Sequence, residues 1–180
     1  MNAMNTHYPD PTLVETASRH TLAVIVDNEP GVLARIAGLF SGRGYNIESL
    51  TVSETEHEKH LTRITIVTAG TAATLQQIKA QLERLVPVHR VVDLTVQGNA
   101  IERELALVKV EGRGDHRVEA MRLAAAFGAR TVDATLSSFV FELTGTTEEV
   151  ERFINRLGAV GLVEVSRTGV GAMARGAEAM

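Results

Sequence analysis

The sequence contains no cysteine and no tryptophan. Without cysteine the chain cannot form disulfide bonds, thiolate nucleophiles or cysteine-based zinc sites, and this composition suits a reducing compartment such as the cytoplasm. The chain also lacks any run of eighteen apolar residues, so we expect no membrane-spanning segment. Residues 1–19 are polar, contain two prolines and lack the apolar core of a secretory signal. We therefore expect residues 1–19 to be a flexible extension.

Positive charge is also scarce. The chain carries 18 Lys and Arg against 22 Asp and Glu, for a formal net charge of -4. Binding to nucleic acid requires a concentrated basic face, so the composition argues against nucleic acid as the main partner. A chain of 180 residues is long enough for two small domains of under about 100 residues each, and domains of that size depend on association for stability. We expect the protein to associate.

The hydrophobic pattern of residues 20–97 predicts one βαββαβ unit. Apolar residues at helical spacing from Leu33 to Phe40 indicate a first helix, ended by Gly42 and Gly44. Thr71 is placed to cap a second helix before Pro87 stops it. The expected strands are 21–26, 47–54, 61–68 and 92–96, and the second helix carries Leu75, Ile78, Leu82 and Leu85.

The same order of elements returns in residues 102–169. Strands are expected at 105–110, 131–136, 139–143 and 162–165, with a helix at 118–127 ended by Gly128 and another capped by Thr146 with Glu149. The predicted fold class is therefore α+β, with two consecutive ferredoxin-like βαββαβ sandwiches. Residues 97–100 are the expected hinge, and residues 170–180, rich in alanine and glycine, are an expected flexible tail.

The turn between the first strand and the first helix is the candidate binding site. Gly31 lies where the helix begins, and the backbone N–H groups there lack intrahelical partners and attract an anion such as a carboxylate. Asn28 and Asn46 bracket the helix with uncharged amides. These groups suit the binding of a free amino acid. No acid, base or nucleophile constellation accompanies them, and no metal-ligand set is evident.

Two segments are similar to a known family. The turn Asn28-Glu29-Pro30-Gly31-Val32-Leu33 and the run Gly44-Tyr45-Asn46-Ile47-Glu48-Ser49-Leu50 resemble the regulatory (small) subunit of acetolactate synthase, whose first half is an ACT domain. The resemblance extends from about His20 to Gly171 and includes the start of the second unit at residues 102–110.

The resemblance implies a non-catalytic subunit that activates a separate catalytic subunit and makes it sensitive to feedback by valine. Thiamine diphosphate, magnesium and FAD are then expected in the catalytic subunit and none of them in this chain. The effector is expected at the interface of a homodimer formed through the ACT domains, on residues 20–97. The implied effector-binding residues are Asn28, Gly31 and Asn46, with Val32, Leu33 and Ile47 adjoining.

Other interpretations stay open. The βαββαβ order also occurs in RNA-recognition domains, but those display aromatic residues within a basic surface. An enzyme in its own right would need a nucleophile or an acid and base pair in a cleft. Within the regulatory class, the chain is alternatively an ACT-domain amino-acid sensor that controls a different enzyme. The sequence decides neither the preference among valine, leucine and isoleucine nor the surface that contacts a catalytic subunit.

Overall fold

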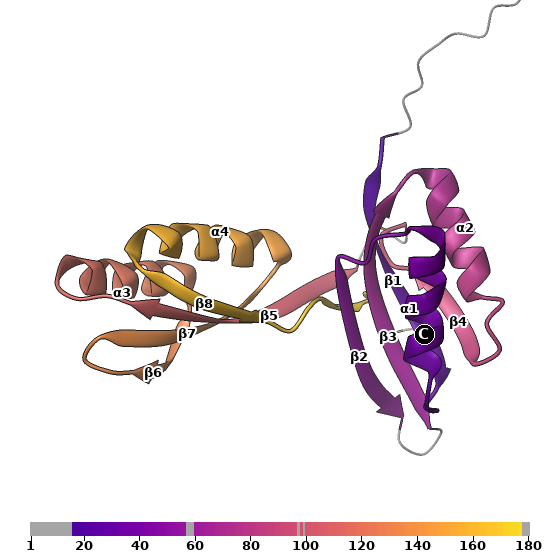
Figure 1. The fold of residues 1–180 in the computed structure, drawn as a ribbon, viewed down its shortest axis with the longest axis horizontal. Helices are drawn as coiled ribbons and strands as arrows, with labels where there is room; N and C mark the ends of the chain where they lie inside the picture. The colour runs from indigo at the N-terminus through magenta and orange to yellow at the C-terminus, as the bar shows by residue number, and fades with distance from the viewer. Residues whose placement is uncertain (1–15, 57–59, 97, 99, 178–180) are drawn as a thin grey trace, which may run out of the picture.

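The computed structural model describes residues 16–56, 60–96, 98 and 100–177. Figure 1 shows two bodies, joined by one long strand and by the returning C-terminal segment. The elements in chain order are β1 (Ser18–Asp27), α1 (Val32–Arg43), β2 (Ser49–Glu56), β3 (Leu61–Gly70), α2 (Ala72–Leu82), β4 (Val88–Asp93), β5 (Ile101–Glu111), α3 (Asp115–Phe127), β6 (Arg130–Ala134), β7 (Ser138–Gly145), α4 (Thr147–Leu157), the 3-10 helix η2 (Gly158–Val160), β8 (Leu162–Arg167) and β9 (Gly171–Met173).

The first body is a βαββαβ unit with an antiparallel sheet in the order β2-β3-β1-β4. Alternate residues of the central strand β1 point to opposite faces, so that Leu22, Val24 and Val26 pack under α1 and α2. The helices supply the other half of this core through Ile36, Phe40, Ile78 and Leu82, all of which are buried. The edges of the sheet are β2 and β4.

The second body repeats the topology, with the order β6-β7-β5-β8. Its core joins β5 and β7 to α3 and α4 through Val108, Phe141, Ala120 and Phe153, each fully buried. The predicted capping box is present: the Thr146 hydroxyl accepts the Glu149 N–H at 3.2 Å, and the Glu149 carboxylate accepts the Thr146 N–H at 2.8 Å. The predicted fold class, two βαββαβ units in an α+β protein, is confirmed.

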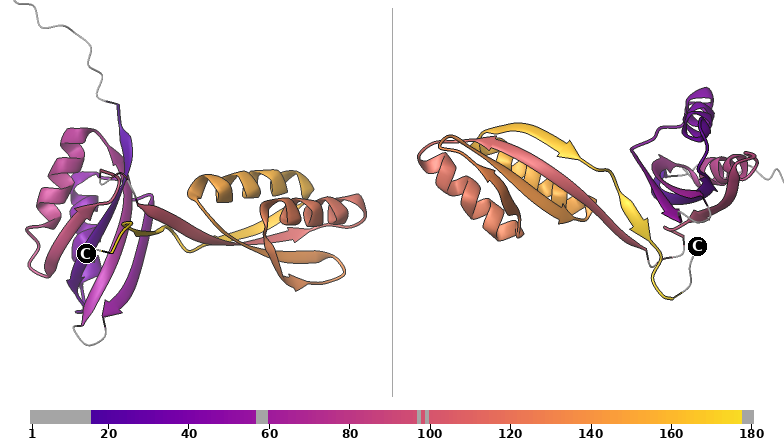
Figure 2. Two further views of the ribbon diagram at one scale, coloured as in Figure 1. Left: turned by 180° about the vertical axis from the view of Figure 1, so that it is seen from behind. Right: turned by 90° about the horizontal axis from the view of Figure 1, so that it is seen from below.

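The C-terminal segment departs from the expectation of a flexible tail over residues 170–180. Residues 168–174, here called the strap, leave β8 and run back to the first body, and β9 within the strap pairs with residues 101–103 of β5. Val170 and Ala172 are buried against the face of the first sheet opposite its helices. Figure 2 shows the strap and β5 approaching that face together. The prediction is wrong for the strap because apolar burial and backbone pairing order it.

Three predicted boundaries also shift. The first helix continues through Gly42, and only Gly44, with a φ of 70°, ends it. The fourth strand ends at Asp93 and does not reach Val96, which is exposed in the turn that follows. Of the extension predicted at 1–19, residues 1–15 lie outside the described residues, and β1 already begins at Ser18. Among the described helices, none has the length and apolar character needed to cross a membrane.

Candidate functional site

The connection between β1 and α1 is a tight turn built by Pro30 and Gly31. Proline fixes φ near -65° at the second position of the turn, which suits turns of type I and type II, and the third position of a type II turn needs a positive φ, which glycine adopts without strain. Gly31 has φ 89° and ψ -8°, and the Val32 N–H points back to the Glu29 carbonyl at 3.5 Å. These values define a type II turn that leads directly into α1.

The turn leaves the start of α1 open to a ligand. No side chain caps this end of the helix within the described part of the chain, and its first turn holds no acidic residue. The first backbone bond of the helix runs from the Arg35 N–H to the Gly31 carbonyl at 3.0 Å, so the N–H groups of Leu33 and Ala34 face outward without an intrahelical acceptor. An anion placed here meets two donors and the positive end of the helix dipole.

Charged side chains lie close to the same turn. The Arg35 guanidinium pairs with the Glu29 carboxylate at 3.2 Å, and both side chains are about half exposed (51% and 47%). The backbone N–H of Asn28 donates to the His60 carbonyl at 2.7 Å, which ties the turn to the start of β3. Sequence reasoning assigned no role to Arg35 or to His60. The helical offset of Arg35 from Gly31, one turn along α1, was the available signal for Arg35.

The six predicted site residues do not meet in one chain. Asn28 and Gly31 lie before α1, whereas Asn46 lies after it, and twelve helical residues at 1.5 Å each separate the two ends by about 18 Å. The side chains of Asn28 and Asn46 are exposed, and neither forms a side-chain hydrogen bond to another described residue. The Asn46 carbonyl, in contrast, accepts the Thr68 hydroxyl at 2.6 Å. A single small ligand therefore cannot touch both amides of the same chain.

The apolar members of the set divide into core and surface. The Val32 side chain is 4% exposed and belongs to the core of the first unit, so only its backbone is available to a ligand. Leu33 is 42% exposed, and Ile47 packs against the core while staying half-buried. Val52, on the edge strand β2, is 45% exposed. Leu33 and Val52 thus leave apolar surface on the edge of the unit that also carries α1 and β2.

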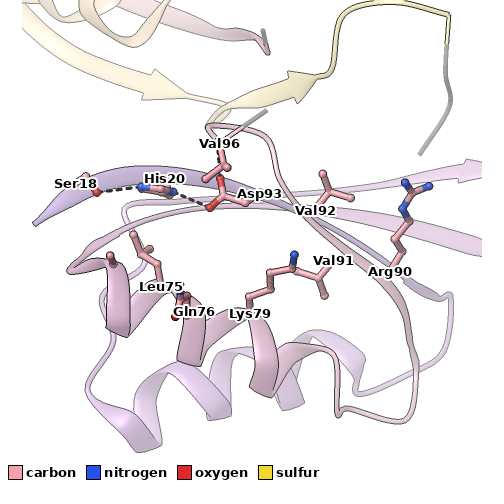
Figure 3. Close-up of a pocket in the computed structure, with 11 residues that line it drawn as sticks. Ser18, His20, Leu75, Gln76, Lys79, Arg90, Val91, Val92, Asp93 and Val96 are labelled. Carbon is pink, nitrogen blue, oxygen red and sulfur yellow. Dashed lines mark hydrogen bonds and ion pairs between the residues drawn. The ribbon is translucent and has the colours of Figure 1, made fainter. Parts of the chain in front are cut away.

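A separate hollow of about 540 Å³ lies between α2 and β4 at the opposite edge of the sheet. Figure 3 shows Ser18, His20 and Asp93 joined in a row on its wall. The Ser18 hydroxyl and His20 Nε2 are 3.0 Å apart, and His20 Nδ1 and the Asp93 carboxylate 2.7 Å apart. The other Asp93 oxygen accepts the N–H groups of Thr95 and Val96. Sequence reasoning missed this row because its members are 73 residues apart along the chain.

We assign the row a structural role, because it fastens the start of β1 to the turn that closes β4. The described residues contain no group of three His, Cys, Asp or Glu side chains able to hold a metal ion.

The topology and the glycine turn at α1 define the class of the protein. The model of the AHAS small subunit-like ACT domain matches residues 22–90, so the first unit is an ACT domain. A second model, the small subunit of acetolactate synthase, matches residues 103–176, which include the strap. The chain belongs to the family of acetolactate synthase small subunits.

Relatives of known sequence and structure agree with this assignment over most of the chain. The probable acetolactate synthase small subunit of Archaeoglobus fulgidus is 44% identical over 158 residues, which are 88% of this chain and 98% of the relative. The isozyme 3 small subunit of Salmonella typhimurium is 43% identical over 163 residues, covering 90% and 99%. The crystal structure of the small subunit from Thermotoga maritima superposes with a TM-score of 0.81 at 36% identity, covering 89% and 99%.

Proposed function

We propose that this chain is the regulatory subunit of an acetolactate synthase, which activates the catalytic subunit and confers feedback inhibition by valine. The observation that carries the proposal is the uncapped start of α1 at Gly31, in an ACT domain of the small-subunit family. Relatives of this length are named small subunits, so the partner is a catalytic large subunit. Thiamine diphosphate, Mg²⁺ and FAD then belong to that partner and not to this chain.

A two-fold dimer brings the separated site residues together. If β2 of one subunit pairs antiparallel with β2 of the other, the two α1 helices lie side by side in opposite directions. The start of one α1, with Asn28 and Gly31, then lies beside Asn46 of the partner subunit. The two halves of the site are thus adjacent in the dimer, although about 18 Å of helix separates them within one chain. Apolar Leu33 and Val52 are covered in the same interface. Each dimer has two equivalent sites of this kind.

The chemistry of each group suits valine. The N–H groups of Leu33 and Ala34 bind its carboxylate, and the Asn28 side-chain oxygen accepts a hydrogen bond from its ammonium group. Leu33 and Ile47 cover its branched side chain. One methylene in an apolar pocket changes affinity by only about 1–3 kcal/mol. We therefore expect leucine and isoleucine to bind more weakly at the same site. If another amino acid binds in preference, the chain is a sensor of the same class with a different effector.

The first test is isothermal titration calorimetry of valine into the purified chain. The variants Gly31→Asp and Asn46→Ala each remove one half of the proposed site, and Gly114→Asp places the same charge at the equivalent turn of the second unit, where glycine also has a positive φ of 57°. We expect Gly31→Asp and Asn46→Ala to lose valine binding and Gly114→Asp to keep it. Binding that survives in Gly31→Asp contradicts the site.

Mixing the two inactive variants tests whether the site is shared between subunits. In a heterodimer of Gly31→Asp with Asn46→Ala, one site carries both substitutions and the other carries neither. After equal amounts are mixed and exchanged, about a quarter of all sites are intact and valine binding returns to that extent. No recovery would place all the binding groups in one subunit and would overturn the shared site.

Catalysis by this chain alone is tested at the Ser18–His20–Asp93 row. A nucleophilic serine hydrolyses an activated ester such as p-nitrophenyl acetate, with acylation of the hydroxyl and release of the phenolate. We expect the parent chain and Ser18→Ala to show the same background rate of ester hydrolysis.

Reconstitution with an acetolactate synthase catalytic subunit measures activation directly. An absence of stimulation would favour a sensor for a different enzyme.

A further inference from the structure

The strap forms contacts with both units over only seven residues. At its start, the Thr168 N–H donates to the Leu105 carbonyl at 3.0 Å, and the Leu105 N–H donates to the Thr168 hydroxyl at 3.1 Å. Two residues later, the Val170 N–H donates to the Ser49 hydroxyl on β2 at 2.8 Å. Between Thr168 and Val170, the strap therefore passes from β5, an inner strand of the second unit, to β2, an edge strand of the first.

The apolar residues of the strap complete the first unit. Val170 (2% exposed) and Ala172 (9%) pack with Ala23, Val67, Val92 and Leu94, on the face of the first sheet that its own helices do not cover. The Arg63 guanidinium donates to the Ala172 carbonyl at 2.6 Å. Burial lowers the pKa of Arg63, and the strap carbonyl is a neutral acceptor for its partly desolvated charge. These contacts fix the strap to the sheet by packing and by hydrogen bonds at two separate strands.

Gly169 is fitted closely to β2. Its φ is +82°, and a Cβ atom added there would lie 2.8 Å from the Ser49 hydroxyl and 2.9 Å from the Thr51 hydroxyl. A Cβ atom essentially never approaches another atom so closely, and residues other than glycine rarely adopt this φ, so a larger residue forces the strap or the two hydroxyl groups of β2 to shift. The positive φ and the close contact together favour glycine at this position.

A second link runs parallel to the strap. The Arg19 side chain on β1 pairs with Glu48, just before β2, at 3.4 Å and with Glu102 on β5 at 3.2 Å. All three side chains are between a quarter and two fifths exposed, so each pair alone contributes little. Together with the strap, however, the arginine joins the same two regions, namely the start of β2 and the start of β5.

We infer that the strap is an interdomain clasp, which holds the second unit at a fixed angle to the ACT domain and ties its position to the start of β2. Two domains linked by a short connection normally move relative to one another unless their interface is large. Here the contact is narrow, and the strap, with Gly169 packed closely against β2, takes the role of a large interface. Ser49 follows Asn46 and Ile47 by only two or three residues, so a ligand that orders this segment also orders the clasp. This coupling, unlike the clasp itself, rests on the proposed function.

The clasp is tested by a distance between spin labels in the full chain. The sequence has no cysteine, so Ala80→Cys on α2 and Asn155→Cys on α4, both exposed, introduce the only two labelling sites. Dilution with unlabelled chain restricts the measured distances to one subunit. We expect one narrow distance distribution in the parent and a width increased about twofold or more when Gly169→Ala releases the strap.

The matched control is Gly176→Ala. Gly176 also has a positive φ, of 98°, but an added Cβ would meet nothing within 4 Å, so this variant has the same backbone strain without the clash. Arg63→Met removes the hydrogen bond to the strap and serves as a second test should Gly169→Ala fold poorly, with Arg90→Met, an exposed arginine of the same sheet, as its control. Equal widths in the parent, Gly169→Ala and Arg63→Met would overturn the clasp.

Coupling is measured separately in the complex with the catalytic subunit. We expect Gly169→Ala to bind valine in calorimetry but to require at least about fivefold more valine for half inhibition, because coupling between sites is typically worth a factor of about 5–150. Unchanged inhibition with a broadened distance distribution would refute the coupling and leave the clasp. If the parent chain binds no valine, the proposed function fails, whereas the distance measurement still decides the clasp.

Discussion

The two units share one strand order but differ in what covers the face of each sheet opposite the helices. In the first unit that face is apolar and covered, and Ala23 and Val67 are fully buried there by the strap. In the second unit the same face carries Lys109, paired with Glu164 at 2.6 Å, and both side chains are exposed. The comparison teaches that strands that are apolar on both faces indicate a cover, whereas alternating strands indicate a free face.

The helix starts show a second difference between the units. The second helix of each unit begins at a threonine, Thr71 or Thr146, whose hydroxyl accepts a backbone N–H. The first helix of each begins at a glycine, and no side chain among the described residues caps it. The first turn of α3, however, contains Asp115, whose charge satisfies the positive end of that helix, whereas α1 has no acidic residue there. Of the four α-helices in the described residues, only α1 is therefore left open to an anionic ligand.

The largest effect on stability is expected at the ion pair that closes the second unit. Arg167 pairs with Glu104, whose side chain is 3% exposed, and with Glu151 at 3.1 Å. Although burial lowers the pKa of Arg167, the hydrogen bonds to Glu104 and Glu151 raise it above its ordinary value. Arg167→Met leaves a buried carboxylate without its partner, and we expect a loss of about 3 kcal/mol in urea unfolding.

Arg130→Met is the matched control for this ion pair. Arg130 pairs with Glu142 at 2.9 Å on the open face, but its side chain is 72% exposed, so its loss should cost about 1 kcal/mol or less. The double variant Arg167→Met with Glu104→Gln removes the unpaired charge and should recover part of the stability. Similar losses for Arg167→Met and Arg130→Met would show that burial does not distinguish the two pairs.

Much of the fold could be predicted because local signals and burial agree. Thr71, Thr146 and Gly128 lie at helix ends as predicted, since capping depends on only a few neighbouring residues. The strand predicted to reach Val96 is wrong at its end. The Asp93 carboxylate accepts the N–H groups of Thr95 and Val96, and the strand ends at Asp93. Local hydrogen bonding there overrides the apolar alternation.

The candidate site and the strap were predictable to different degrees. The positions of Asn28 and Asn46 before and after one helix already imply that a single chain cannot bring them together, and the structure adds the edge position of β2. The strap could not be predicted from residues such as Gly169 and Ala172, because small residues show no periodicity and their burial depends on a distant sheet.

A smaller effect is expected at the edges of the two sheets. The edge strand β2 is the proposed subunit interface, and β6 is its equivalent at the edge of the second sheet. Val52→Lys places a charge in the proposed interface and should weaken the dimer about tenfold in analytical ultracentrifugation. Val132→Lys changes an equally exposed valine (44% against 45%) on β6 and should leave the dimer dissociation constant unchanged. The reverse result would place the interface on the second unit.

The smallest effect distinguishes the two threonine caps by their response to pH. Thr71→Ala and Thr146→Ala should each cost about 1 kcal/mol at neutral pH, because both hydroxyls accept a backbone N–H with the same geometry. Only the cap of α4 includes a carboxylate, and its hydrogen bond from the Thr146 N–H lowers the pKa of Glu149. A carboxyl group with a lowered pKa stabilises the folded state above its ordinary pKa, and this contribution disappears as the pH falls through the lowered value.

Glu149→Gln should therefore flatten the acid side of the curve of unfolding free energy against pH, measured by urea unfolding from pH 6 to about pH 3. Thr71→Ala should instead lower the whole curve without changing its slope. A flattened curve for Glu111→Gln, an exposed control at the end of β5, would show that general charge and not the cap sets the slope.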